Sequence, residues 1–103
     1  MAELSVAQLD TLVEQATVDA YDDDERLSGF HVMIEDSLAM PFRTTVLGVE
    51  VTVKKVELRA GSGIVATCVR GRHRQEIGIL DLPLPDPPPE GSEWIEAYRY
   101  GCP

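Results

Sequence analysis

The sequence is poor in cysteine, with Cys68 and Cys102 alone among 103 residues. The two do not form a CxxC pair, and no pattern of histidines beside them supplies zinc ligands. Neither a disulfide framework nor a zinc site is therefore expected. Cys68 falls in the apolar run IVATCV, which indicates a small buried residue rather than a nucleophile.

Long apolar runs are also missing. None reaches the roughly 20 residues that cross a membrane. The first fifteen residues carry acids where a secretory signal needs bases. We therefore expect a cytoplasmic protein with no membrane partner.

Basic residues are scarce, since nine Lys and Arg stand against eighteen Asp and Glu and the formal charge is −9. The electrostatic field of a negatively charged protein repels phosphate backbones, so nucleic acid is not an expected partner. Cations and basic protein surfaces remain, although an acidic composition most often only keeps a protein soluble.

Motifs of catalysis are absent as well. The serines lack an elbow motif, and the Gly-Ser-Gly at 61–63 is too short for a phosphate loop. Neither His31 nor His73 has an evident nucleophile beside it. We therefore expect a protein that is not an enzyme.

Residues 1–40 show helical periodicity. Ser5 and Gln8 resemble a capping box, and apolar residues then recur at helical spacing over roughly residues 5 to 20. Any of the aspartates at 22–24 could cap a second helix. Pro41 would end that helix, because the residue before proline is pushed out of the helical region.

Between 41 and 82 the apolar period changes to two, which is the mark of a half-buried strand. Apolar and polar residues alternate from 49 to 53, and the phase then slips around Lys54 and Lys55, as a β-bulge would cause. Turns at 61–63 and 70–74 separate the later strands. Four short strands joined by tight turns predict a small antiparallel barrel.

Residues 83–103 form a proline-rich tether and a short closing helix in this interpretation. The stretch LPLPDPPPEG at 82–91 carries five prolines and should run extended across the surface. It either tethers the last helix or serves as a ligand for proline-reading domains, and loop statistics favour the tether. Ser92 then caps a helix with Trp94, Ile95 and Tyr98 on its apolar face. The whole chain is expected to be one α+β domain.

The densest chemical feature is an acidic run at the start of the second predicted helix. Five carboxylates fall within seven residues, and like charges this close repel one another. Calcium, a hard cation that takes about six to eight oxygen ligands, suits such a cluster. The alternative is a helix start rich in acids because the helix dipole favours them. The run consists of Asp19, Asp22, Asp23, Asp24 and Glu25.

An EF-hand is excluded by the spacing. Counting from Asp22, Leu27 stands where the loop requires glycine, and Met33 stands where it requires glutamate. A calcium site would therefore draw its ligands from separate segments. The further candidates are Glu35 and Asp36 at the end of the second helix and Asp81 after the last strand.

Two segments, VDAYDDDER at 18–26 and IEDSLAMPF at 34–42, resemble a small family of calcium-binding proteins typified in cyanobacteria, which has no EF-hand. The resemblance covers about the first half of the chain well and the remainder in outline. It implies two N-terminal helices packed on an SH3-like β-barrel, with calcium bound by surface carboxylates.

Residue by residue, the resemblance favours Glu35 and Asp36 most, then Asp19 and Glu25, and the aspartates at 22–24 more loosely. The resulting hypothesis is a calcium buffer or sensor. The alternative is a non-catalytic interaction module in which the barrel or the proline-rich strip docks a protein partner and the acids serve solubility alone. The predicted ligands are Asp19, Asp22, Asp24, Glu25, Glu35, Asp36 and Asp81.

Overall fold

The computed structural model describes residues 4–101, which form three helices and four strands. The helices are α1 (Val6–Ala16), α2 (Asp23–Ser37) and α3 (Glu93–Gly101). The strands are β1 (Phe42–Val46), β2 (Val49–Arg59), β3 (Gly63–Arg70) and β4 (His73–Gly78). The α+β class and the order of the predicted elements are confirmed. None of the three described helices combines the length and apolarity that a membrane span requires.

The start of α1 follows the predicted capping box. The Ser5 hydroxyl accepts a 3.1 Å hydrogen bond from the Gln8 amide, and the Gln8 side chain accepts a 2.8 Å bond from the Ser5 amide. The helix ends at Ala16, four residues before the predicted end. There the amide and the hydroxyl of Thr17 both donate to the carbonyl of Val13, at 3.0 and 2.7 Å, and turn the chain out of the helix.

The strands form an antiparallel meander in the order β1-β2-β3-β4. The register between β2 and β3 shifts between Val53 and Lys55, so the β-bulge predicted from the phase slip is confirmed. The sheet is open, because β1 and β4 each pair with one strand in the described chain. The closed barrel predicted from the strand pattern is therefore not formed.

The proline-rich stretch runs past one edge of the open sheet. It leaves β4 and returns past β1, where the Thr44 hydroxyl donates a 2.6 Å bond to the carbonyl of Pro83. Proline lacks an amide hydrogen, so this stretch cannot add a paired strand between the two edges. Leu82 is buried in the core, and the Glu90 carbonyl accepts a bond from the Ala39 amide. These contacts agree with the tether interpretation.

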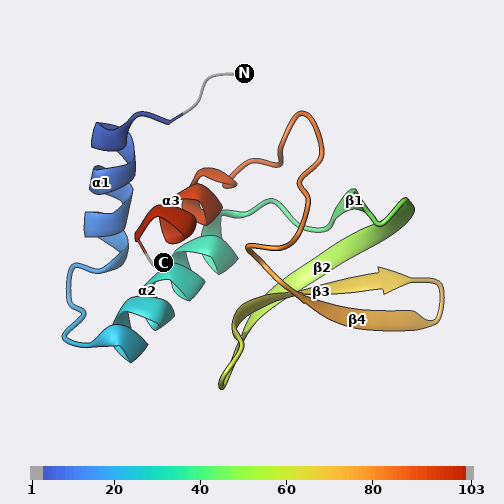
Figure 1. Cartoon of the computed structure of the whole chain (residues 1–103), viewed down its shortest axis with the longest axis horizontal. Helices are drawn as coiled ribbons and strands as arrows, with labels where there is room; N and C mark the ends of the chain where they lie inside the picture. Colours follow the sequence, from blue (N-terminus) through green and yellow to red (C-terminus); the bar gives the residue numbers. More distant parts are fainter. Residues whose placement is uncertain (1–3, 102–103) are drawn as a thin grey trace.

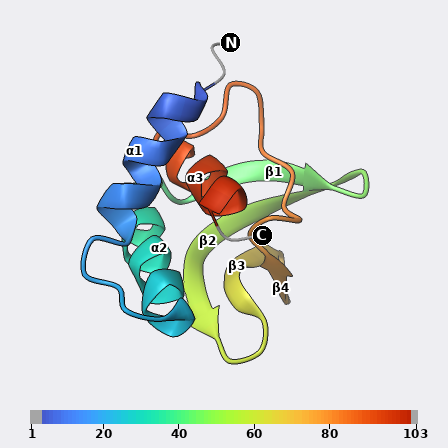
Figure 2. The ribbon, with the colours of Figure 1, turned by 60° about the vertical axis from the view of Figure 1, so that its left-hand side comes forward.

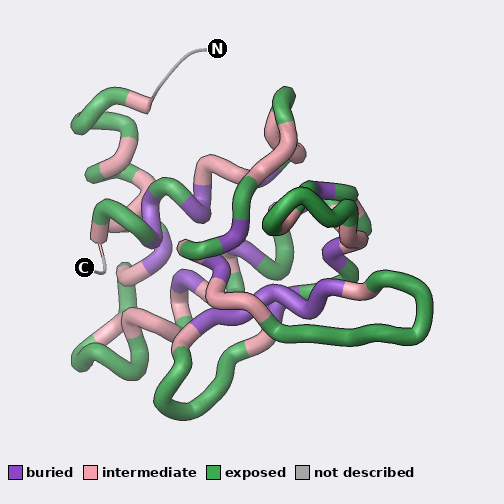
Figure 3. Tube along the Cα trace, turned by 45° about the vertical axis from the view of Figure 1, so that its right-hand side comes forward, coloured by how far each residue is buried: buried purple, intermediate pink, exposed green. Residues whose placement is uncertain are grey.

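The helices gather on one side of the sheet (Figures 1 and 2). α2 packs against β2 and β3, whereas α1 and α3 pack against α2 and against each other. Figure 3 shows that β3 is buried along most of its length and that β4 is exposed. Phe30 and Ile34 of α2 reach the core, which also includes Val53 and Ile64 from the sheet.

Cys68 lies in this core, and burial raises the pKa of its thiol. Both findings agree with the prediction of a packed residue rather than a nucleophile. Cys102 lies outside the described residues.

Candidate functional site

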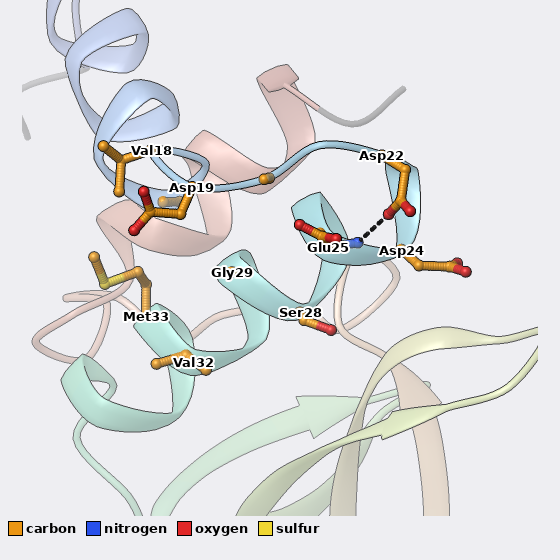
Figure 4. Close-up of a pocket in the computed structure, with 11 residues that line it drawn as sticks. Val18, Asp19, Asp22, Asp24, Glu25, Ser28, Gly29, Val32 and Met33 are labelled. Atoms are coloured by element: carbon orange, nitrogen blue, oxygen red, sulfur yellow. Dashed lines mark hydrogen bonds between the residues drawn. The ribbon is translucent and has the colours of Figure 1, made fainter.

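An open hollow of about 470 Å³ lies where the turn after α1 meets α2 (Figure 4). We call it the acidic hollow, because its lining includes four of the seven predicted calcium ligands. Lys, Arg and His do not contribute to its lining within the described chain. The four acids are Asp19, Asp22, Asp24 and Glu25.

The hollow depends on a close approach of two helices. A Cβ atom on Gly29 of α2 would overlap the carbonyl oxygen of Ala16 at the end of α1. Because glycine lacks that atom, the last turn of α1 rests directly on α2. The chain then reverses over residues 17–22, with the Ala20 amide bonded to the Thr17 carbonyl at 3.0 Å, and carries Asp19 to the edge of the hollow.

Two of the acids stabilise the start of α2. Asp22 is the N-cap residue, and its Oδ1 accepts a 2.8 Å bond from the amide of Glu25. Glu25 reaches back, and its Oε2 accepts a 3.0 Å bond from the amide of Tyr21. This exchange satisfies amides at the helix start, and negative charge there complements the helix dipole. Part of the acidic run therefore has a structural explanation.

The other two acids, Asp19 and Asp24, are exposed and make no hydrogen bond within residues 4–101. In Figure 4 their carboxylates lie at opposite ends of the hollow, and Asp24 points away from it. The described residues contain no group of three or more His, Cys, Asp or Glu side chains arranged to hold a metal ion. The acids thus surround the hollow without converging on one point.

The remaining predicted ligands lie elsewhere. Glu35 and Asp36 are in the last turn of α2, and Glu35 is about 15 Å along the helix axis from Glu25 at 1.5 Å per residue. Glu35 Oε2 is 3.7 Å from Nε2 of His31, one turn earlier. Asp81 is exposed in the turn after β4, where its amide bonds the Gly78 carbonyl. The seven predicted ligands therefore do not share one site.

Sequence reasoning missed the apolar part of the acidic hollow. Val18, Val32 and Met33 line it beside the carboxylates. Val18 is 75% exposed and Val32 is 50% exposed, and the nearby Tyr21 is 89% exposed. Val18 and Tyr21 are apolar residues among the acids of the sequence. Their presence in an otherwise polar segment was the feature from which an apolar surface could have been predicted.

No family model, curated protein or solved structure matches the chain. The resemblance to the cyanobacterial calcium-binding proteins therefore remains a hypothesis, and the choice between candidate ligands depends on the geometry described above.

Proposed function

We propose that the protein binds calcium at the acidic hollow and acts as a cytoplasmic calcium buffer or sensor. The observation that supports this is that four acidic residues line one hollow to whose lining no described base contributes. The resemblance of VDAYDDDER to the non-EF-hand calcium-binding family points to the same segment. In this proposal the bulged, four-stranded sheet is an open form of the SH3-like barrel of that family.

The capping bonds leave room for an ion. Asp22 uses Oδ1 and Glu25 uses Oε2 toward backbone amides, so the second oxygen of each carboxylate remains for a cation. Asp19 and Asp24 are exposed and reach the ion by rotating their side chains. Calcium accepts irregular geometry and completes its shell with carbonyls and water.

Since the ligands must move before they bind, we expect weak affinity, with a dissociation constant on the order of 10⁻⁴ M or above. The bound ion would cancel the repulsion among the acids of the run. It would also tie the turn after α1 to α2, because ligands on both segments would share one cation.

Calorimetric titration of two charge-matched double variants tests the proposal. The hollow variant combines Asp22→Asn with Glu25→Gln, and the helix-end variant combines Glu35→Gln with Asp36→Asn. Asparagine caps helices about as well as aspartate, so the hollow variant should keep its fold. We expect the hollow variant to lose calcium affinity by about tenfold, because each removed charge weakens an ion contact. The helix-end variant should stay within about twofold of the parent.

Two other results would contradict this assignment. If the helix-end variant alone loses affinity, the ion sits on the ligands that the family resemblance ranks first, and the acidic hollow is not the site. If the parent chain gives no heat of binding with calcium, the acids serve capping and solubility, and the calcium function is wrong.

The exposed apolar residues of the same hollow favour a second candidate, an interaction module. Val18 and Val32 beside a ring of carboxylates suit a partner segment that is both basic and apolar. A Lys- and Leu-rich amphipathic peptide is a suitable probe. A Val32→Ser variant should weaken binding of the peptide and leave calcium binding unchanged, which separates the two candidates.

A further inference from the structure

The charges of this acidic chain are unevenly distributed. Residues 1–41 carry ten Asp and Glu and one Arg. Residues 42–78, which hold all four strands, carry seven Lys and Arg and three Glu. The strand region is therefore net positive in a protein whose formal charge is −9, and a local reversal of sign attracts anions to that part of the surface.

Three of the seven cations of the strand region line a second open hollow, of about 540 Å³. We call it the basic hollow. Arg43 of β1, Lys54 of β2 and Arg70 of β3 line it. In the sheet register Arg43 pairs with Thr52, and Thr52 pairs with Val69, so Arg43, Thr52 and Val69 lie on one face of neighbouring strands. Lys54 borders the hollow from the bulge of β2, and Arg70 borders it from the last position of β3. The rest of the lining is Glu50, Thr52, Val69 and Gly71.

Two of the three cations have no partner in the described chain. Lys54 and Arg70 make no ion pair and no side-chain hydrogen bond within residues 4–101. Arg43 lies 4.0 Å from Glu50, at the limit of an ion pair.

Two other cations of the sheet, Lys55 and Arg59, are paired with acids. Lys55 Nζ is 2.7 Å from Glu57, and Arg59 pairs with both Glu57 and Glu76. Arg72 and Arg74, which do not line the basic hollow, make no ion pair or side-chain hydrogen bond in the described chain either, so Lys54 and Arg70 are two of four such cations in the strand region.

The basic hollow is remote from the acidic one. Figure 1 places the β3–β4 turn and the α1–α2 turn at opposite ends of the longest axis, along which the molecule extends 40 Å. Exposed charges are screened over about 8 Å at physiological ionic strength. The acidic run therefore does not cancel the local positive potential at the sheet.

We propose that the basic hollow binds a dianionic oxyanion, either free phosphate or the phosphate group of a small phosphorylated molecule. Guanidinium groups such as those of Arg43 and Arg70 match phosphate oxygens with paired donors, and the Lys54 ammonium adds a compact charge. The Thr52 hydroxyl supplies a further donor. Glu50 opposes an anion, and Arg43 beside it offsets that charge. This inference is independent of calcium binding.

Neighbouring lysines provide the test. Lys54 lines the basic hollow, whereas Lys55 is paired with Glu57, and both are exposed on β2. Lys54→Gln and Lys55→Gln therefore remove the same charge from adjacent positions. Inorganic phosphate and glycerol 3-phosphate are titrated into each variant and the parent in calcium-free buffer, with amide chemical shifts as the readout and acetate as the monoanion control.

We expect saturable shifts at Thr52, Arg70 and Gly71 in the parent. Lys54→Gln should weaken binding by about tenfold, the loss typical of one charge-assisted contact, and Lys55→Gln by less than about twofold. An Arg70→Gln variant should repeat the loss. Tighter binding of glycerol 3-phosphate than of phosphate would identify a phosphorylated molecule as the ligand, and equal binding would identify the phosphate group alone.

Three results would overturn the proposal. Shifts that do not saturate at millimolar phosphate would show that no site exists. An equal effect of the two lysine variants would show diffuse attraction to the sheet. Equal affinity for acetate and phosphate would show that the hollow does not select a dianion.

Discussion

Gly29 of α2 lies so close to the carbonyl of Ala16 at the end of α1 that a Cβ atom on Gly29 would overlap the carbonyl oxygen. This contact sets the distance between the first two helices. Both residues also line the acidic hollow, so the contact that joins the helices shapes the candidate site.

We expect Gly29→Ala to destabilise the protein. In a free helix interior this change stabilises by about 1 kcal/mol, because alanine is the better helix former. Here the added methyl must push α1 away from α2, and overpacking of this kind costs about 1–3 kcal/mol. Chemical denaturation should therefore show a net loss, with Ser28→Ala at the exposed neighbouring position as the control. A stabilised Gly29→Ala variant would contradict the close packing of the two helices.

The cap at Asp22 gives a second prediction. Asp22→Ala removes the acceptor for the Glu25 amide and should cost about 1 kcal/mol. Asp22→Asn keeps an acceptor and should lower the free energy of unfolding by only about a few tenths of 1 kcal/mol. Asp24→Ala is the charge-matched control, because Asp24 accepts no hydrogen bond within the described chain. Urea denaturation without calcium measures all three, and equal losses for Asp22→Ala and Asp24→Ala would rule out the cap.

Local features of the fold were predictable, and long-range closure was not. The capping box at Ser5 and Gln8 depends on residues three apart, and the bulge near Lys54 appears as a slip in a two-residue period. Both signals lie within a few neighbouring residues. Closure of the barrel depends on whether β1 meets β4, which are far apart in the sequence, and no local pattern of residues reports on that pairing.

The candidate site was predictable to a similar extent. Asp22 and Glu25 are neighbours on one helical turn, so their sharing of a hollow follows from the sequence. Glu35 and Glu25, which the prediction groups together, are ten residues apart on one helix and about 15 Å apart along its axis. The contact of Gly29 with Ala16 has no signature in the spacing of acids, and it places Asp19 beside α2.

The ion pairs on the sheet predict a response to acid. The hydrogen bond from Lys55 lowers the pKa of Glu57, and the hydrogen bond from Arg59 lowers the pKa of Glu76. A lowered folded-state pKa gives stability that is present above the unfolded value of about 4.5 and is lost as the pH falls through the folded value. NMR titration of the carboxyl carbons should give pKa values below 4.5 for both Glu57 and Glu76. Addition of 1 M salt should raise both pKa values toward 4.5.

The matched variant for this response is Arg59→Gln. It removes the donor to Glu76, so the pKa of Glu76 should rise toward its ordinary value. Lys55 continues to donate to Glu57, whose pKa should rise less. Equal shifts of both carboxyls would mean that the general charge of the sheet, and not these bonds, sets their pKa values.

A bond between the two ends of the chain predicts a response to base. The Tyr100 hydroxyl donates a 2.7 Å hydrogen bond to Oδ1 of Asp10, joining α3 to α1, and this bond raises the pKa of Tyr100. The corresponding stability is present below the unfolded value of about 10 and is lost as the pH rises through the raised folded value. The difference between the absorbance titrations of the parent and of the Tyr100→Phe variant should give a pKa above 10 for Tyr100. That pKa should be lower in the Asp10→Ala variant. An unchanged value in Asp10→Ala would exclude the bond as the cause.

Removal of calcium should lower the melting temperature if the acidic hollow holds the ion. Calcium at about 100 times its dissociation constant stabilises a folded state by about 2.7 kcal/mol. For a domain of this size that corresponds to a rise of about 11–22 °C over the protein in chelator. Magnesium should give a smaller rise, because it demands regular octahedral geometry and gives up water reluctantly.

The double variant Asp22→Asn and Glu25→Gln separates a bound ion from simple screening of charge. A bound ion needs those carboxylates, so the variant should melt at the same temperature with calcium and with chelator. Screening acts on the whole net charge, and the variant would then retain most of the rise. Equal melting temperatures of the parent chain in calcium and in chelator would contradict calcium binding, and the acidic run would then serve to cap α2.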